Sequence, residues 1–315
     1  MYHDHFALVT EPFGVTPDAR FFFSSEQHVE ASASLYYTVA QRRGFAVLIG
    51  HPGLGKTSVL VNLAERIAGE ARVAFLVHPH LSGGAVLDSV LLAMGLEPAS
   101  DPVERLRQFH NFLLDLSRQG KTCLVIIDEA QNLGFEALET IRMLSNFEAP
   151  THKLIQFILA GQPALEDLLR RPEAEQILQR VNSITRLHPL NEKQLGDYIT
   201  HRLSIAGRQE KLFTPAAIRA LAQLSGGIPR NVNTLCFNAL TLAFAEGKKT
   251  VDADCIAQTA FERFADAPRP SVPESNSNST FNFSAPAHYR PSRALVTAAL
   301  TLLTLVCAGV ILGLR

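Results

Sequence analysis

Short apolar runs and helical patterns alternate along the first 265 residues of the chain. The apolar runs predict strands at 45–49, 73–78, 123–128, 155–160 and 184–187. Between them, apolar residues recur every three or four positions, which predicts helices at 56–68, 103–117 and 133–147. Continuous apolar strands that alternate with helices are typical of a parallel sheet covered by helices on both faces. We therefore expect an α/β fold.

The strand signal stops after Pro189. Helical patterns alone follow, and they predict a small all-α domain with helices at 191–206, 215–224, 229–245 and 252–264. Before the sheet region, Ser24 and Gln27 have the spacing of a capping box and predict a helix that ends near Arg43. The expected parts are a leading segment with that helix, an α/β domain and an all-α domain, at 1–44, 45–189 and 190–265.

The last 50 residues have a different composition. Residues 266–293 are rich in proline, serine and asparagine and predict a disordered linker. Residues 294–314 carry no charge, and 21 helical residues would extend about 30 Å, the thickness of a bilayer core. Two arginines precede this stretch and one follows it, so a span here would place the N-terminal part in the cytoplasm. We therefore expect a single transmembrane helix.

Composition and charge narrow the functional classes. Hydrophobic residues make up 47% of the chain, which is enough for a sizeable core. The formal net charge is −1, so no global attraction to nucleic acid is expected and a nucleic-acid partner is disfavoured. The four cysteines are far apart and form no CxxC pair, which argues against a zinc site or a disulfide framework.

A phosphate-binding loop is predicted directly after the first strand. The segment 50–57 (GHPGLGKT) matches GxxxxGK[ST] and stands between a strand and a helix, the context that this motif requires. Its backbone amides and the following helix N-terminus would face the phosphates, Lys56 would reach the β- and γ-phosphates, and Thr57 would bind Mg²⁺. The predicted nucleotide-binding residues are Gly50, His51, Pro52, Gly53, Leu54, Gly55, Lys56, Thr57 and Ser58.

Two adjacent carboxylates end the third expected strand. Asp128 and Glu129 follow the apolar run LVII. Neighbours on a strand point to opposite faces, so two acids here serve different tasks. We expect Asp128 to hold Mg²⁺ through water and Glu129 to orient and polarise the attacking water. The expected cofactors are therefore ATP and Mg²⁺.

These motifs resemble those of AAA+ ATPases and, more narrowly, of the ExeA-type ATPases (general secretion pathway protein A). The resemblance covers residues 1 to about 265. It rests on the acid pair continued as DEAQ (128–131), on the opening MYxxHF followed by PF, PD and SEQH, on GQP (161–163) and on GIPRN (227–231). It implies a P-loop AAA+ fold in which 190–265 form a C-terminal lid.

The resemblance also implies roles for particular residues. Gln162 corresponds to the sensor-1 group near the γ-phosphate, and Arg230 stands where sensor 2 is expected. Arg180 is the best candidate for an arginine finger that acts on the ATP of a neighbouring subunit. Nearby rivals for that role are Arg170, Arg171 and Arg186.

For several other residues the sequence leaves the role open or indicates only a structural one. The phenylalanines of the opening, at 6, 13 and 21–23, either wall the adenine or pack in a core. His28 and His51 have no recognisable partner and are interpreted as structural or loop residues.

The expected function is that of a membrane-anchored AAA+ ATPase in the bacterial inner membrane. It would hydrolyse Mg-ATP, form a homo-oligomer and drive assembly or remodelling of a secretion or cell-envelope complex through a protein partner. The alternatives are a DNA-binding, transposition-type helper ATPase and a nucleotide-gated scaffold with little turnover. The neutral charge balance argues against the first and Glu129 against the second.

Overall fold

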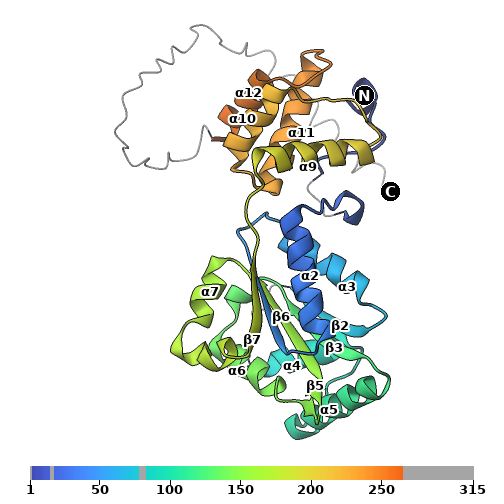
Figure 1. Cartoon of the computed structure of the whole chain (residues 1–315), viewed down its shortest axis with the longest axis vertical. Helices are drawn as coiled ribbons and strands as arrows, with labels where there is room; N and C mark the ends of the chain where they lie inside the picture. Colours follow the sequence, from blue (N-terminus) through green and yellow to red (C-terminus); the bar gives the residue numbers. More distant parts are fainter. Residues whose placement is uncertain (1, 15–17, 78–82, 265–315) are drawn as a thin grey trace, which may run out of the picture. The chain divides into compact units, whose positions relative to one another are not determined.

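A computed structural model describes residues 2–14, 18–77 and 83–264 of the chain (Figure 1). Contacts divide the chain into the units Met1–Ala267 and Pro268–Arg315. The second unit, with most of the expected linker and the whole expected transmembrane segment, lies outside the described residues.

A five-stranded parallel sheet forms the centre of the α/β part. Its strand order is β2–β3–β6–β1–β7, so β1 lies between β6 and β7. The paired residues run in parallel register, with Val47 of β1 opposite Leu159 of β6 and Ile184 of β7. The strands are β1 (Phe45–Ile49), β2 (Ala71–Leu76), β3 (Thr122–Ile127), β6 (Ile155–Gly161) and β7 (Val181–Arg186).

Helices cover both faces of this sheet because its strands are apolar on both sides. Alternate residues of β1 enter different clusters: Phe45, Val47 and Ile49 pack with α4 to α7, whereas Ala46 and Leu48 pack with α2 and α3. The helices are α2 (Glu26–Ala40), α3 (Lys56–Arg66), α4 (Gly83–Ala93), α5 (Pro102–Arg118), α6 (Phe135–Leu144), α7 (Pro163–Leu169) and α8 (Glu175–Leu178). The strands β4 (Glu148–Ala149) and β5 (His152–Lys153) form a separate hairpin.

Four helices form a second cluster after the sheet. They are α9 (Glu192–Ile205), α10 (Pro215–Ser225), α11 (Pro229–Ala245) and α12 (Ala253–Phe264). The first of them begins with a full capping box, in which Asn191 and Gln194 exchange side-chain and backbone hydrogen bonds. We call these four helices the helical bundle.

The N-terminal segment packs on the helical bundle. Short helix α1 (Tyr2–His5) leads into Phe6 and Phe13, which are buried with apolar residues of α9 and α11. Backbone groups reinforce the contact: the amide of Val9 donates to the carbonyl of Ala206, and the Arg208 guanidinium donates to the carbonyl of Phe6 at 2.6 Å. Of the two roles left open for the opening phenylalanines, the structure supports core packing for these two.

The expected strand 45–49 and the expected helix 229–245 are confirmed residue for residue. The expected capping box was wrong. The N-cap of α2 is Ser25 rather than Ser24, and its side chain makes no capping hydrogen bond. The hydroxyl of Ser25 faces His28 instead.

The prediction of a single-pass inner-membrane protein is not supported. Across residues 2–14, 18–77 and 83–264, no helix is long and apolar enough to cross a bilayer. The longest helices there, α5 and α11, have 17 residues each and extend about 26 Å, short of the roughly 20 residues that a span requires. The stretch 294–314, on which the prediction rested, lies outside the described residues.

Candidate functional site

The segment 50–57 runs from the end of β1 into the first turn of α3, at the carboxyl edge of the sheet. Lys56 opens α3 and is only 5% exposed. Its ammonium donates to the carbonyl oxygens of Gly50 at 2.9 Å and His51 at 3.5 Å. Gly55, with φ of 94°, makes the left-handed turn that leads into the helix. The Lys56 ammonium therefore lies against backbone carbonyl groups of the loop that precedes it.

Burial lowers the pKa of the Lys56 ammonium. The carboxylates of Glu129 and Asp128 act against this shift, while the Arg230 guanidinium adds to it. The site thus contains a desolvated cation that an anionic phosphate would stabilise.

A hydroxyl and a carboxylate meet beside this lysine. Asp128 directly follows β3 and is 2% exposed. Its Oδ2 accepts from the Thr57 hydroxyl at 2.5 Å, and its Oδ1 accepts from the Glu129 amide at 2.9 Å. Mg²⁺ prefers such oxygen ligands and is usually held by one or two carboxylates together with substrate phosphates. The hydroxyl and carboxylate of this pair are therefore the kind of oxygen ligands that a Mg²⁺ shared with a nucleotide would use.

Glu129 lies among amide groups. Its backbone is left-handed, with φ of 54°, which is uncommon for a residue other than glycine. Its Oε2 accepts hydrogen bonds from the side-chain amides of Gln131 at 2.7 Å and Gln162 at 3.1 Å. The structure therefore places the predicted sensor-1 residue in contact with the predicted water-polarising acid. Their catalytic roles stay predictions.

The helical bundle contacts the phosphate-binding loop through Arg230. The backbone amide of Arg230, in the first turn of α11, donates to the carbonyl of Gly53 at 3.3 Å. A Cβ at Gly53 would lie 2.8 Å from the Cβ of Arg230 and 3.0 Å from Ile228. Glycine is thus required here both by its φ of 83° and by this close approach.

His28 also contacts the loop, which the sequence analysis did not foresee. The ring is 6% exposed, and its Nε2 donates to the carbonyl of Leu54 at 3.1 Å. Because a carbonyl only accepts, Nδ1 is the unprotonated nitrogen and accepts from the Ser25 hydroxyl. Burial lowers the pKa of this histidine. The serine and histidine belong to the SEQH segment of the resemblance, which was the available signal.

The remaining loop residues differ in exposure. Leu54 is buried in the apolar cluster below α2 and α3 and anchors the loop. Ser58 is half-buried, while His51, Pro52 and Thr57 are exposed. These positions are compatible with contact to a nucleotide, and their predicted roles are untested.

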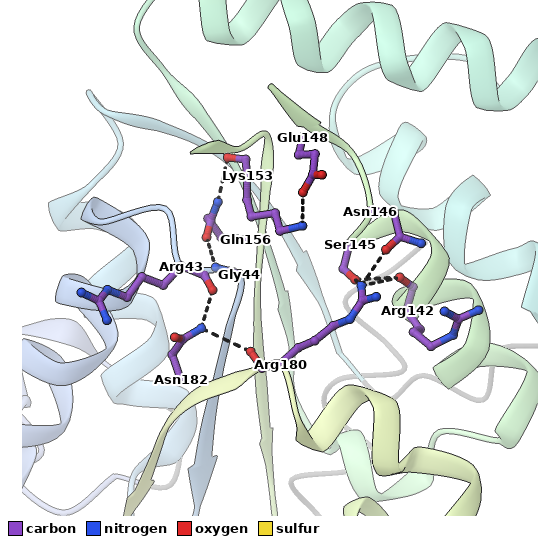
Figure 2. Close-up of polar contacts among 10 residues, drawn as sticks. All are labelled: Arg43, Gly44, Arg142, Ser145, Asn146, Glu148, Lys153, Gln156, Arg180 and Asn182. Atoms are coloured by element: carbon purple, nitrogen blue, oxygen red, sulfur yellow. Dashed lines mark hydrogen bonds and ion pairs between the residues drawn. The ribbon is translucent and has the colours of Figure 1, made fainter. Parts of the chain in front are cut away.

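Arg180 lies at the opposite, amino edge of the sheet. It directly precedes β7, and one of its guanidinium nitrogens donates to the Ser145 hydroxyl at 2.6 Å and to Asn146 Oδ1 at 2.7 Å (Figure 2). Val181, the residue after Arg180, pairs with Phe45 of β1. Phe45 is five residues before Gly50, a distance of about 16 Å along the strand. The structure therefore does not bring Arg180 to the phosphate-binding loop of its own chain.

The rival arginines have other surroundings. Arg170 and Arg186 both pair with Glu166, at 2.5 and 2.8 Å. These two pairs lower the pKa of the Glu166 carboxyl. Arg171 is the N-cap residue of the short 3-10 helix Pro172–Ala174. Arg180 thus differs from Arg170 and Arg186 in that its hydrogen bonds go to neutral groups. A hydrogen bond from Lys153 lowers the pKa of the Glu148 carboxyl, and the charge of Arg180 also contributes to this shift.

Comparison with known proteins identifies the fold. The AAA domain family matches residues 39–169 of the chain. General secretion pathway protein A from Aeromonas hydrophila is 36% identical over 264 residues, which are 83% of this chain and 48% of that protein. The chain thus contains a segment that matches the AAA domain family and is similar to general secretion pathway protein A. It spans about half the length of that relative.

Solved structures agree on the fold. The ORC2 protein of Aeropyrum pernix superimposes with a TM-score of 0.63 at 16% identity, covering 82% of this chain and 72% of that one. Cdc6p of Pyrobaculum aerophilum gives 0.61 at 17% identity, with 78% and 71% covered. The predicted P-loop α/β fold with a parallel sheet is confirmed, and this AAA+ fold implies nucleotide binding. That 190–265 act as a lid stays a prediction.

Proposed function

We propose that this protein binds Mg-ATP and hydrolyses it to ADP and phosphate, and that hydrolysis drives assembly or remodelling of a secretion or cell-envelope complex. The observation that carries the enzymatic part is the convergence of a buried cation, a hydroxyl–carboxylate pair and a second acid at one edge of the sheet. These groups are Lys56, Thr57 with Asp128, and Glu129 with Gln162.

Each group has a distinct task in this proposal. Lys56 exchanges the loop carbonyls for the β- and γ-phosphate oxygens. Thr57 and Asp128 would hold Mg²⁺, which would neutralise charge that develops on the phosphates. Glu129 accepts the proton of the water that attacks the γ-phosphorus, and ADP leaves. Gln162 and Arg230 face the γ-phosphate as sensors 1 and 2.

The proposed active assembly is a homo-oligomer. Arg180 lies about 16 Å, measured along β1, from the loop of its own chain, so its proposed target is the ATP of a neighbour. Three acceptors orient its guanidinium, namely the carbonyl of Arg142, the hydroxyl of Ser145 and the side chain of Asn146. We therefore assign Arg180 as the finger in trans.

The client is proposed from the relationship to general secretion pathway protein A. At 36% identity over 83% of this chain, the similarity extends well beyond the nucleotide loop. The proposed partner is a protein of a secretion or envelope complex. Co-purification of chromosomally tagged protein with such components tests this assignment, and recovery of only nucleic-acid-binding proteins would contradict it.

The enzymatic proposal is tested with phosphate release by the purified chain. Wild type should hydrolyse ATP only with Mg²⁺, and EDTA should abolish turnover. Glu129→Gln keeps the size of the side chain and should retain ATP binding while turnover falls about 10²-fold or more. Tight ATP binding by wild type without turnover would favour the nucleotide-gated scaffold instead.

A further inference from the structure

We propose that Gln131 is a positioning residue that holds the carboxylate of Glu129 in the orientation needed to activate water. The inference rests on the proposed ATPase function and concerns a residue to which no role has been assigned. Gln131 lies in the 3-10 turn Ala130–Asn132, two residues after Glu129, and is half-buried.

Both ends of the Gln131 amide are engaged. Its Oε1 accepts from the backbone amide of Gln162 at 3.1 Å, and its Nε2 donates to Glu129 Oε2 at 2.7 Å. A backbone N–H can only donate, so it requires the oxygen of Gln131 to face Gln162. The nitrogen must then face Glu129. The orientation of the donor is therefore fixed by the backbone of Gln162, which directly follows β6 and is the N-cap residue of α7.

Gly161 makes this bridge possible. A Cβ at this position would lie 2.6 Å from Gln131 Oε1, which is too close for any real contact. The glycine at the end of β6 thus leaves room for the glutamine side chain. The two short motifs DEAQ and GQP, 30 residues apart, are joined through this one amide.

Gln131 and Gln162 donate to the same oxygen, but their proposed tasks differ. Gln162, as sensor 1, must direct its amide toward the γ-phosphate when ATP is present. Gln131 is held by a backbone group and can keep its bond to Glu129 throughout. A glutamate side chain has three rotatable bonds, and the left-handed backbone of Glu129 is uncommon for such a residue. The charge-assisted bond from Gln131 therefore decides where the carboxylate points.

The experiment compares Gln131→Met with a matched control. Methionine keeps the length of the side chain and removes both hydrogen bonds. The control is Gln156→Met, the same change at a buried glutamine that also bridges two segments but lies at the amino edge, bonded to Gly44 and Lys153. For each variant, kcat and KM for ATP, the Kd of a fluorescent ATP analogue and the Tm are measured.

For Gln131→Met we expect kcat to fall about 10-fold or more with Kd close to wild type, since misplacing a reacting group by about 1 Å can cost about 10²-fold. The loss of Tm should be smaller than in the control, because the Gln162 amide that loses its acceptor is only partly buried. Gln131→Glu should be worse, because a second carboxylate repels the first. The control should keep its kcat per folded molecule and lose Tm. In a Glu129→Gln background, Gln131→Met should change the residual turnover no further.

The outcomes separate the two proposals. No turnover by the wild type would overturn the ATPase function and this inference together. If the wild type turns over ATP and Gln131→Met has an unchanged or raised kcat, the inference alone is overturned. A raised kcat would mean that Gln131 holds Glu129 in a less active orientation. Equal losses of kcat, Kd and Tm in Gln131→Met would also overturn it, because they indicate a role in folding.

Discussion

The two edges of the central sheet use polar side chains differently. At the carboxyl edge, the two acids bond to side chains: Asp128 to Thr57, and Glu129 to Gln131 and Gln162. The backbone amide of Gln162, which Gln131 also satisfies, is only partly buried. At the amino edge, Gln156 bonds to the amide of Gly44 at 2.6 Å and to the carbonyl of Lys153 at 3.1 Å.

Asn182 repeats the amino-edge pattern, donating to the carbonyls of Arg43 and Arg180 (Figure 2). The difference has a thermodynamic meaning. A side chain that satisfies another side chain can exchange that partner for a ligand, whereas one that satisfies a buried backbone group leaves it unpaired when removed. Changes at the carboxyl edge should therefore affect mainly function, and changes at the amino edge should affect mainly stability.

The largest contrast is expected for Lys56→Ala at the carboxyl edge. Loss of a charge-assisted bond to phosphate should weaken ATP binding about 100-fold. The free energy of unfolding should fall less than the affinity, because removing the ammonium also removes the desolvation cost that lowers its pKa, which offsets the lost bonds to the loop carbonyls. Isothermal titration and urea unfolding measure the two quantities. A stability loss as large as the affinity loss would contradict the comparison.

Arg180 is the predicted exception at the amino edge, because its proposed task lies in a neighbour. Wild-type specific activity should rise with protein concentration, and Arg180→Ala should lower the plateau about 10-fold or more with ATP affinity retained. Mixing Arg180→Ala with Glu129→Gln should restore activity, since one interface then combines both intact residues. Mixtures no more active than their components, at concentrations where light scattering detects oligomers, would rule out the finger.

Gln156→Met should show the opposite behaviour to Lys56→Ala. The glutamine is 0% exposed, so its loss strands the amide of Gly44 and should cost about 1–3 kcal/mol of unfolding free energy. The Kd for ATP should not change. Thermal and urea denaturation measure the cost, and Gln179→Met, at an exposed glutamine, serves as the control.

The smallest effect concerns pH and His28. Burial lowers its pKa in the folded protein, so the unfolded chain binds more protons as the pH falls below about 6.5, and stability should decrease from pH 7 toward pH 5. His28→Gln should reduce this slope, and His51→Gln, at an exposed histidine, should not. Equal slopes for all three proteins in urea unfolding would show that His28 does not contribute.

Local sequence patterns predicted those strands and helices whose position depends on neighbouring residues in the sequence. The strand Phe45–Ile49 is a plain apolar run, and the helix Pro229–Ala245 starts with a proline suited to its first turn. Helix α4 was missed because it is apolar nearly all round: Val86, Leu87, Val90 and Leu91 are buried, so no polar stripe reveals a helical period.

The candidate site was predictable as far as its motifs extend. GxxxxGKT and the acid pair identified the loop and its partners, and the structure brings them together. The bridge from Gln131 to Gln162 joins positions 31 apart and depends on which strands are neighbours. The contact of His28 with Leu54 likewise arises from the packing of α2 on α3, which no local pattern encodes.

The packing of Phe6 and Phe13 among helices α9 to α12 has a consequence for synthesis on the ribosome. Their apolar partners, such as Leu203 and Leu235, are translated about 200 residues later, which takes roughly 10–40 s at 5–20 residues per second. The whole sheet emerges in that interval and can fold first. Until the helices are synthesised, the apolar side chains of Phe6 and Phe13 lack the partners that bury them in the folded protein.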